Sequence, residues 1–284
     1  MDEQMRYFLV YCSPAGSTRH LAEVAAAELE RLGNPCTLLA IGRRAAIEEA
    51  RQRLAAGGGP LCLYLGTPVY SAHALPPVIE FIAGLPVAAS AWAVPLVTWG
   101  GATSGVALYE MTAALAAKGY RPVGAAKVLA VHSLMWQAEQ PLGAGHPDAA
   151  DDELLRGLVR EVALRLAAGG AAARLSPADL RCQPPAVFAQ LQAASLELAR
   201  QTLPPRVVDE ELCTQCGTCA ESCPVGAVSL EPFPVWGAAC ILCFNCMREC
   251  PAGAVQADLS PVHAYIRQRA ATFAETPGSQ VFLP

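Results

Sequence analysis

Charged and aromatic residues are scarce in this sequence, at 16% and 6% of its 284 residues. The net charge is -5, and Lys and Arg are nowhere concentrated. Because phosphate backbones are bound by clustered cations, the composition argues against nucleic acid as a partner. The chain is 53% hydrophobic, with alanine supplying much of that share. Its length is comfortable for two globular domains.

Long hydrophobic runs are also lacking. The one stretch long enough to weigh as a membrane span is the uncharged segment between Glu80 and Glu110. Pro86, Pro95 and the Gly100-Gly101 pair break it, so a buried strand flanked by loops explains it better than a spanning helix. The first residues lack the apolar region and cleavage site of a signal peptide. We therefore expect no membrane span and a cytoplasmic location.

Cysteine is present in a specific pattern. Four cysteines are scattered singly, whereas eight of the twelve lie between Cys213 and Cys250. In a chain without an export signal, clustered cysteines are more often metal ligands than disulfides. The eight form two copies of C-x2-C-x2-C-x3-C-P, the spacing that binds [4Fe-4S] clusters: Cys213, Cys216, Cys219 and Cys223, then Cys240, Cys243, Cys246 and Cys250.

The fourth cysteine of each run is expected on a short helical turn, pointing toward the other cluster. One cluster would then have Cys213, Cys216, Cys219 and Cys250 as ligands, and the other Cys240, Cys243, Cys246 and Cys223. Matching flanks, at residues 223–228 and 250–255, indicate an internal duplication. Gly217, Thr218 and Gly226 suit a backbone that approaches inorganic sulfur closely.

A pair of zinc sites is the alternative for these cysteines. Zinc motifs typically use two CxxC pairs, so the repeated four-cysteine run favours iron-sulfur clusters. Residues 207–257 resemble bacterial-type two-cluster ferredoxins, and this resemblance implies one-electron transfer at low potential. A domain this small has little core, so bound clusters should supply much of its folding energy.

From residue 6 to about 168, short apolar runs alternate with helix-patterned stretches. This pattern is typical of a parallel sheet covered on both faces, an α/β doubly wound fold. We predict five strands, at residues 7–11, 35–40, 61–65, 93–98 and 123–131. The predicted helices span residues 18–32, 45–55, 76–85, 104–118 and 151–168.

The loop after the first strand opens directly into a helix and is rich in hydroxyls: Ser13, Pro14, Ala15, Gly16, Ser17 and Thr18. Free backbone amides at a helix N-terminus form a phosphate cradle. The absence of Lys excludes a Walker loop, and no G-x-G-x-x-G is present. An ordinary N-cap turn is the alternative.

Two more loops should end on the same edge of the sheet, where open α/β folds bind ligands. They contain Thr67, Pro68, Val69 and Tyr70, and Thr98, Trp99, Gly100 and Gly101. Each supplies an aromatic ring and backbone amides, as a flavin ring requires. Tyr70 and Trp99 are the candidate stacking residues, unless they are ordinary half-buried aromatics.

Together the three loops resemble those of flavodoxin-like FMN domains, and the whole chain resembles flavodoxin-ferredoxin fusion proteins of anaerobic bacteria and archaea. His132-Ser133 and residues 145–148, Gly-His-Pro-Asp, belong to the same resemblance. It implies FMN phosphate on the first loop and the ring between the other two. The sequence departs from the family at Ala15 and Ser17, where a hydroxyl and an amide are usual, and after Gly100, where an Asn-Arg pair is expected.

The predicted division is a flavodoxin-like domain over residues 1–170, a Pro-rich connector over 171–205 with a helix at 187–203, a ferredoxin domain over 206–258, and a tail over 259–284. The tail should form one helix at 261–275, packed on the ferredoxin. His73, His132, His146 and His263 lack metal-ligand spacing. Cys12 is expected to be a small buried residue at a strand end, and we assign no catalytic residue.

These features predict an electron-transfer protein that exchanges electrons between FMN and two [4Fe-4S] clusters and delivers them to a redox partner protein. Two alternatives are an FMN-dependent reductase that acts directly on a small substrate, and a flavin-free domain that docks the ferredoxin on its partner.

Overall fold

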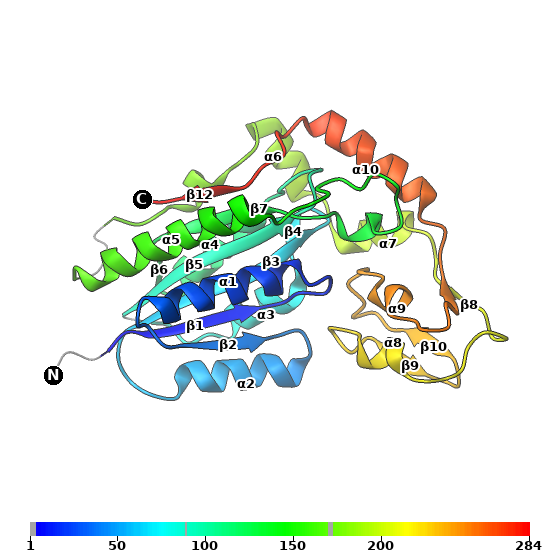
Figure 1. Ribbon diagram of the computed structural model, residues 1–284, viewed down its shortest axis with the longest axis horizontal. Coiled ribbons are helices and arrows are strands. Elements are labelled where there is room, and N and C mark those ends of the chain that lie inside the picture. Colours follow the sequence, from blue (N-terminus) through cyan, green and yellow to red (C-terminus); the bar gives the residue numbers. More distant parts are fainter. Residues whose placement is uncertain (1–3, 89, 170–172) are drawn as a thin grey trace.

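A parallel β-sheet forms the core of the amino-terminal part of the chain (Figure 1). The computed structural model describes residues 4–88, 90–169 and 173–284. Five parallel strands follow the flavodoxin-like order β2-β1-β3-β5-β7, which brings their carboxyl ends to one edge. Their bounds are β1 (Arg6–Tyr11), β2 (Cys36–Ala40), β3 (Leu61–Tyr70), β5 (Ala91–Trp99) and β7 (Ala125–Leu129). The predicted doubly wound fold is confirmed.

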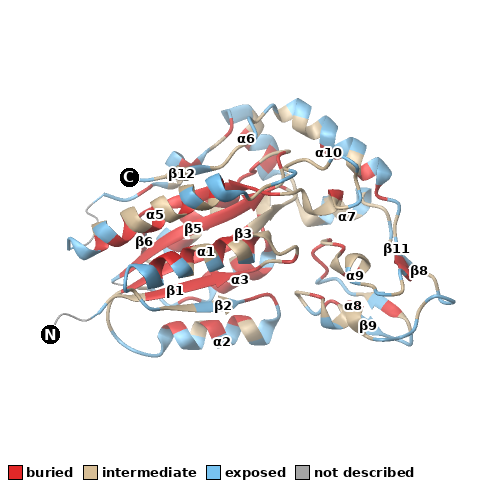
Figure 2. Cartoon of the chain, in the orientation of Figure 1, coloured by how far each residue is buried: buried red, intermediate tan, exposed pale blue. Residues whose placement is uncertain are grey.

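Alternate residues of each strand face opposite layers of helices. Tyr7 and Leu9 face one hydrophobic cluster, and Phe8 and Val10 face the other. The first cluster is covered by α1 (Ser17–Arg31) and α5 (Ala149–Ala167), the second by α2 (Arg44–Ala55), α3 (Pro76–Ala83) and α4 (Ala107–Ala117). The strands are largely buried, whereas the outer faces of the helices are exposed (Figure 2). Each helix predicted for this domain begins and ends within three residues of the observed helix.

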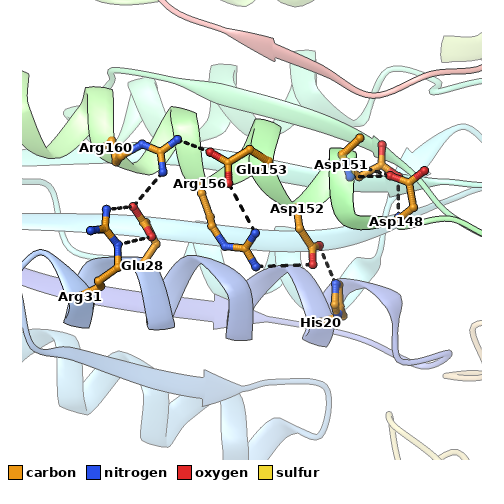
Figure 3. Close-up of polar contacts among 10 residues, drawn as sticks. His20, Glu28, Arg31, Asp148, Asp151, Asp152, Glu153, Arg156 and Arg160 are labelled. Atoms are coloured by element: carbon orange, nitrogen blue, oxygen red, sulfur yellow. Dashed lines mark hydrogen bonds and ion pairs between the residues drawn. The ribbon is translucent and has the colours of Figure 1, made fainter.

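Helices α1 and α5 lie side by side and are joined by ion pairs (Figure 3). Glu28 is buried at 3% exposure and accepts hydrogen bonds from Arg31, at 2.9 and 2.6 Å, and from Arg160 at 3.2 Å. The Arg31 hydrogen bonds, followed by Arg160, lower the pKa of Glu28 to about 2. Near the other end of the pair, His20 Nε2 lies 2.7 Å from a carboxylate oxygen of Asp152. The layer over this face is therefore fixed by charge as well as by apolar contact.

The sheet contains more strands than the five predicted. The predicted strand at 123–131 is observed as the shorter β7, and an additional strand just ahead of it, β6 (Tyr120–Pro122), pairs with β5. β3 runs five residues past its predicted end and pairs with β4 (His73–Ala74) through a two-residue turn. Near the carboxyl terminus, β12 (Gln280–Phe282) pairs antiparallel with β7. A three-residue strand carries no visible alternation, so the sequence pattern gave no sign of it.

The connector and tail also differ in part from expectation. The predicted helix at 187–203 is two helices, α6 (Pro185–Gln192) and α7 (Leu196–Thr202), because Ser195 accepts the Leu198 N–H and begins a new helix. A short 3-10 helix, η2 (Pro177–Leu180), precedes them. The tail helix is present as α10 (Ser260–Phe273). The predicted boundary at 170/171 lies outside the described residues. Among the described residues, no helix is both long and apolar enough to cross a membrane.

The cysteine-rich unit is built from two similar halves. Its strands pair antiparallel, β8 (Val207–Val208) with β11 (Val255–Gln256) and β9 (Val228–Leu230) with β10 (Pro234–Trp236). Two one-turn helices, α8 (Thr218–Glu221) and α9 (Asn245–Arg248), lie together, and the Asn245 amide donates to the Ser222 carbonyl at 3.2 Å. Little of this unit is fully buried in Figure 2.

This unit packs against the carboxyl edge of the parallel sheet. After β2, Arg43 donates to the carbonyls of Ala220 at 2.9 Å and Glu221 at 2.8 Å. A Cβ on the neighbouring Gly42 would lie 2.2 Å from the carbonyl oxygen of Pro224, so only glycine permits this approach. Ile241, from the second cysteine run, is 3% exposed within the main core cluster of the sheet. The two parts therefore share a core.

After α10 the chain returns to the sheet, and a buried ion pair holds it there. Glu275 lies 2.7 Å from Lys127 on β7, and the two side chains are 7% and 8% exposed. Glu275 also accepts the Ser104 N–H at 2.8 Å and the Gln183 amide at 3.0 Å. Burial alone would raise the pKa of Glu275, but the hydrogen bonds from Lys127, Ser104 and Gln183 hold it below its usual value. This network anchors the tail that leads to β12.

Replacing Glu275 by Gln should destabilise the fold, because Lys127 would stay buried without its anionic partner. Breaking a buried pair in this way typically costs about 3–5 kcal/mol. The control is Glu49→Gln, which removes an exposed pair with Arg53 and should cost about 0–1 kcal/mol. Chemical unfolding of both variants at pH 7 measures the difference.

The loss should also depend on pH. A carboxylate whose folded pKa is depressed stabilises the protein above its unfolded pKa of about 4.3, and this stabilisation disappears as the pH falls through the folded pKa. The difference in free energy of unfolding between wild type and Glu275→Gln should therefore become smaller below about pH 4. A gap that is absent at pH 7, or that widens in acid, would contradict the assigned role.

Candidate functional site

One cavity in the cysteine-rich unit is lined by four cysteines from both runs. Cys213, Cys216 and Cys219 come from the first run and Cys250 from the second. Its other lining residues include Gly217, where a left-handed φ of 81° turns the loop around the cavity. This grouping matches the crossed set expected for one cluster. The helical turns differ from expectation, because α8 and α9 carry the third cysteines, Cys219 and Cys246, and the fourth ones follow them.

The remaining four cysteines also lie near one another. Burial raises the pKa of the Cys243 thiol to about 12, and the thiols of Cys246, Cys240 and Cys223 act in the same direction. A thiol in such surroundings becomes a thiolate only when a cation or metal compensates the charge. The group is thus suited to a metal cluster and unsuited to four free thiolates.

Hydrogen-bond donors point at the sulfurs of this second group. The Arg206 guanidinium lies 3.3 Å from Cys240 Sγ, and the Trp236 indole N–H donates to Cys246 Sγ at 3.2 Å. The Ala227 N–H donates to Cys223 Sγ at 3.2 Å. Donors of this kind stabilise metal-bound thiolates. Arg206 and Trp236 were not predicted from the sequence, since neither lies in the cysteine motif.

A second cavity, of about 110 Å³, lies at the carboxyl edge of the sheet. The structure brings the three predicted loops together around it. Ten of the fourteen predicted residues line it: Ser13, Ala15, Ser17, Thr18, Pro68, Val69, Tyr70, Thr98, Trp99 and Gly100. The cavity is several times larger than the roughly 10–15 Å³ that one water needs. It is smaller than most ligand pockets, which measure about 300–1,000 Å³.

The first loop is open at the start of α1. Gly16, with φ of 94°, is the N-cap residue and has no side chain to cap the helix, and the first turn contains no acidic residue. Ser13 Oγ accepts the Arg19 N–H at 2.9 Å, which holds the loop against the helix. Thr18 is buried, and its hydroxyl lies 2.8 Å from that of Thr98, which joins the first loop to the third. The helix N-terminus is therefore free to receive an anion.

Four predicted residues do not line the cavity. Pro14, Gly16 and Gly101 are among them, and the two glycines have left-handed φ values of 94° and 77° that turn their loops. Thr67 is fully buried, and its hydroxyl accepts the Leu75 N–H at 3.1 Å at the start of α3. Its role is structural because its hydroxyl has no access to the cavity.

Trp99 borders the cavity but is held from the other side. It is 1% exposed, its indole N–H donates to the Gly278 carbonyl at 3.2 Å, and the Lys127 ammonium lies 5.2 Å from its ring centre. The residue therefore anchors the tail, which the sequence did not indicate. Stacking on a flavin stays a prediction for Trp99, as it does for Tyr70.

Sequence reasoning missed the far wall of the cavity. A fourth loop contributes Ala130 to Leu134, the connector contributes Leu196 and Leu203, and the second cysteine run contributes Ile241 and Leu242. The adjacency of the cysteine run to the sheet depends on packing between residues nearly 200 positions apart. No local motif in the sequence signals such a contact.

His132 is the one histidine that lines the cavity among the described residues. Burial lowers its pKa to about 4, and the nearby His263 acts in the same direction. The Leu134 N–H points at Nδ1 at 3.3 Å, so the neutral ring carries its proton on Nε2. His132 therefore offers a neutral N–H donor and no positive charge at neutral pH.

A polar cluster elsewhere is explained by helix capping. His146, Asp148 and Asp151 bring their ligand atoms within 4.8 Å of one another. Asp148 accepts the N–H groups of Ala150 and Asp151, and the Asp151 carboxylate accepts the Asp148 N–H, which completes a capping box at α5. Helix capping therefore accounts for this arrangement of the two aspartates.

Comparison with known proteins identifies one segment by sequence. Residues 206–229 match the family model of the 4Fe-4S binding domain, which includes the first cysteine run. No curated protein matches the chain.

Among solved structures, the chain is similar to the rubredoxin oxygen:oxidoreductase from Desulfovibrio gigas, with 18% identity, a TM-score of 0.42, and coverage of 59% of this chain and 37% of that one. An archaeal flavodoxin has 16% identity and a TM-score of 0.41 over 57% of this chain and 99% of its own. An apo NADH:FMN oxidoreductase, EMOB, has 21% identity and a TM-score of 0.41 over 61% of this chain and 95% of its own. Similarities this low carry no argument about function, so the fold assignment rests on the strand order.

The strand order and the matched cysteine segment together describe the chain's architecture. It joins a flavodoxin-like domain to a ferredoxin-type segment that binds a 4Fe-4S cluster.

Proposed function

We propose that this chain is an electron-transfer iron-sulfur flavoprotein that carries FMN and two [4Fe-4S] clusters and passes electrons to or from a partner protein. The observation that carries the proposal is the shared wall between the two sites. Ile241 and Leu242, which line the cavity at the sheet edge, lie between Cys240 and Cys243 in the second cysteine run. A cofactor in that cavity would therefore adjoin the cluster held by Cys223, Cys240, Cys243 and Cys246.

Repeated backbone geometry supports two clusters instead of one. Gln215 and Gly217 have left-handed φ values of 56° and 81° in the first run. The equivalent residues of the second run, Leu242 and Phe244, have φ values of 58° and 56°. Bulky residues rarely adopt this conformation, and they persist there only when the surroundings require it. Both runs thus form the same wrapped loop, as expected if each surrounds a cubane.

The chemistry of the first loop fits the phosphate of FMN. Ser13 and Ser17 offer hydroxyls, and the uncapped amides at the start of α1 offer N–H donors and the positive end of the helix dipole. When bound, FMN accepts two electrons and releases them one at a time, so it connects two-electron donors to one-electron clusters. The residues of the three loops would hold it next to the nearer proposed cluster.

The whole cavity, at about 110 Å³, is smaller than a typical ligand pocket. Leu196, Leu203, Ile241 and Leu242 close it from the side of the ferredoxin unit. A flavin ring would displace these aliphatic side chains outward or replace their mutual contacts. Their apolar character suits a ring with a hydrophobic face and excludes water from the space between ring and cluster.

Cys12 and Tyr70, two residues near Cys243, are uncharged at neutral pH. Burial raises the pKa of Cys12 to about 12, and the nearby Cys243 acts in the same direction. Burial, with the same neighbour, raises the pKa of Tyr70 as well. Both side chains stay protonated and neutral at pH 7, so they contribute packing but no charge near Cys243.

A pair of double variants tests the crossed ligation. Cys213→Ala with Cys250→Ala removes two ligands of the same proposed cluster and should leave about four of eight iron atoms per chain. Cys213→Ala with Cys223→Ala removes one ligand from each cluster and should retain far less. Iron and acid-labile sulfide analysis under anaerobic conditions measures both. Cys182→Ala, outside the runs, should keep the wild-type content.

Equal iron in the two double variants would contradict the crossed assignment. More iron in the Cys213 and Cys223 pair would indicate that each run holds its own cluster. Zinc in place of iron in the wild-type protein would overturn the cluster proposal itself.

The phosphate site is tested by placing a negative charge in it. Ser17→Asp is compatible with the first turn of a helix, so the fold should be preserved. The aspartate would repel the FMN phosphate and remove a hydrogen bond to a charged group, which is worth about 1.5–3 kcal/mol. FMN affinity should fall about ten- to a hundredfold by fluorescence titration. Riboflavin, which lacks the phosphate, is the matched ligand and should bind both proteins equally.

Failure of the wild-type protein to bind FMN at micromolar concentration would contradict the flavin proposal. The small volume of the cavity and the burial of Trp99 would then favour the second candidate, a flavin-free domain that docks the ferredoxin unit on its partner.

A further inference from the structure

Arg206 occupies an unusual position beside the second cysteine group. Both terminal nitrogens of its guanidinium lie 3.3 Å from Cys240 Sγ, and one lies 3.7 Å from Cys246 Sγ. The group is stacked between two rings, 4.7 Å from the centre of Trp236 and 5.0 Å from that of Phe244. The rings fix the plane of the guanidinium and direct its N–H donors at the sulfurs.

Among the described residues, the hydrogen bonds of the Arg206 side chain go to thiols, those of Cys240 and Cys246. In the part of the chain that the structure describes, none of its ion pairs joins Arg206 to a carboxylate. A partly buried cation without an anionic partner is costly. The cost is offset when Cys240 and Cys246 are thiolates, which is their state as cluster ligands.

Charge is distributed unevenly between the two cysteine groups. Residues 206–258 contain seven acidic side chains and two basic ones, Arg206 and Arg248. Both arginines lie on the side of the second group, where Arg248 on α9 donates to the Ser133 carbonyl at 2.6 Å. The first group has exposed Glu210 and Glu211 just ahead of Cys213, and Cys216 itself is exposed.

We infer that Arg206 makes the cluster at Cys223, Cys240, Cys243 and Cys246 the first of the two to be reduced, so that a single electron rests beside the sheet-edge cavity. This inference rests on the proposed pair of clusters and deepens it by assigning their order. Reduction adds one electron and one negative charge to a cluster, with no proton. A cation in contact with the thiolates stabilises that added charge, and donors to sulfur act in the same direction.

Solvent works against this order. The first group is open to water, which stabilises added charge, whereas the second is largely enclosed. A full charge in direct contact acts through a less screened medium than water at a surface, so its effect is the larger one. The acids near Cys213 add to the difference because they oppose a further negative charge there.

A reductive titration followed by electron paramagnetic resonance tests the inference on the full, anaerobically loaded protein. In the wild type, the first electron should appear on the cluster near Arg206. Cys216→Ser identifies the signal of the other cluster, since it changes a ligand of that one alone. Arg206→Gln should lower the equilibrium constant for reduction of the cluster beside residue 206 at least tenfold. This corresponds to a shift of its reduction potential by about 59 mV toward negative values. Arg206→Lys keeps the charge and should shift it less.

The controls separate charge in contact with sulfur from charge in general. Arg248→Gln removes the other arginine of the unit, which has no contact with sulfur, and should give a smaller shift than Arg206→Gln. Iron and sulfide content must match wild type before potentials are compared. If Arg206→Gln loses the near cluster, the reduction order of the wild type still decides the question.

Two results would overturn the inference: first reduction at the cluster of Cys213, Cys216, Cys219 and Cys250, or an unchanged potential in a fully loaded Arg206→Gln protein. Neither depends on flavin. A protein that binds no FMN but shows the expected order would refute the flavin proposal and leave this one standing.

Discussion

The contact between the second cysteine run and the carboxyl edge of the sheet determines how every other part of this molecule functions. Ile241 enters the core of the sheet, Leu242 lines the cavity, and Cys243 follows them in the chain and packs against the same core. Arg43 and the absent side chain of Gly42 hold the same face together. Because the loop belongs to both sites, the proposed flavin would lie next to the proposed cluster.

The segments before and after the cysteine-rich unit both help to maintain that contact. The connector supplies Leu196 and Leu203 to the cavity wall before the cysteine-rich unit begins. After the unit, α10 crosses the top of the molecule in Figure 1, and the tail returns to β7 through the Lys127–Glu275 pair and β12. A unit fixed at entry and exit cannot swing away from the sheet without breaking a buried ion pair.

Much of this architecture could be predicted from the sequence, and the successes share a physical cause. The cysteine runs, the loop at Ser13 to Thr18 and the buried strands depend on spacing and on neighbouring residues, which a sequence displays directly. β12, the split at Ser195, the anchoring of Trp99 and the position of Arg206 depend on residues distant in the chain, and local pattern gave no sign of them. The sequence predicts Thr67 as part of a cofactor loop, but its hydroxyl accepts the Leu75 N–H at the start of α3, a contact that local pattern also did not reveal.

The central claim is that a flavin and a cluster share the wall formed by Ile241 and Leu242. Anaerobic crystals of the protein loaded with iron, sulfide and FMN test it most directly, through anomalous scattering at the iron edge. The account predicts two iron peaks, one among Cys213, Cys216, Cys219 and Cys250 and one among Cys223, Cys240, Cys243 and Cys246, with flavin density against the second. A cavity without flavin, or flavin bound away from that iron peak, would contradict it.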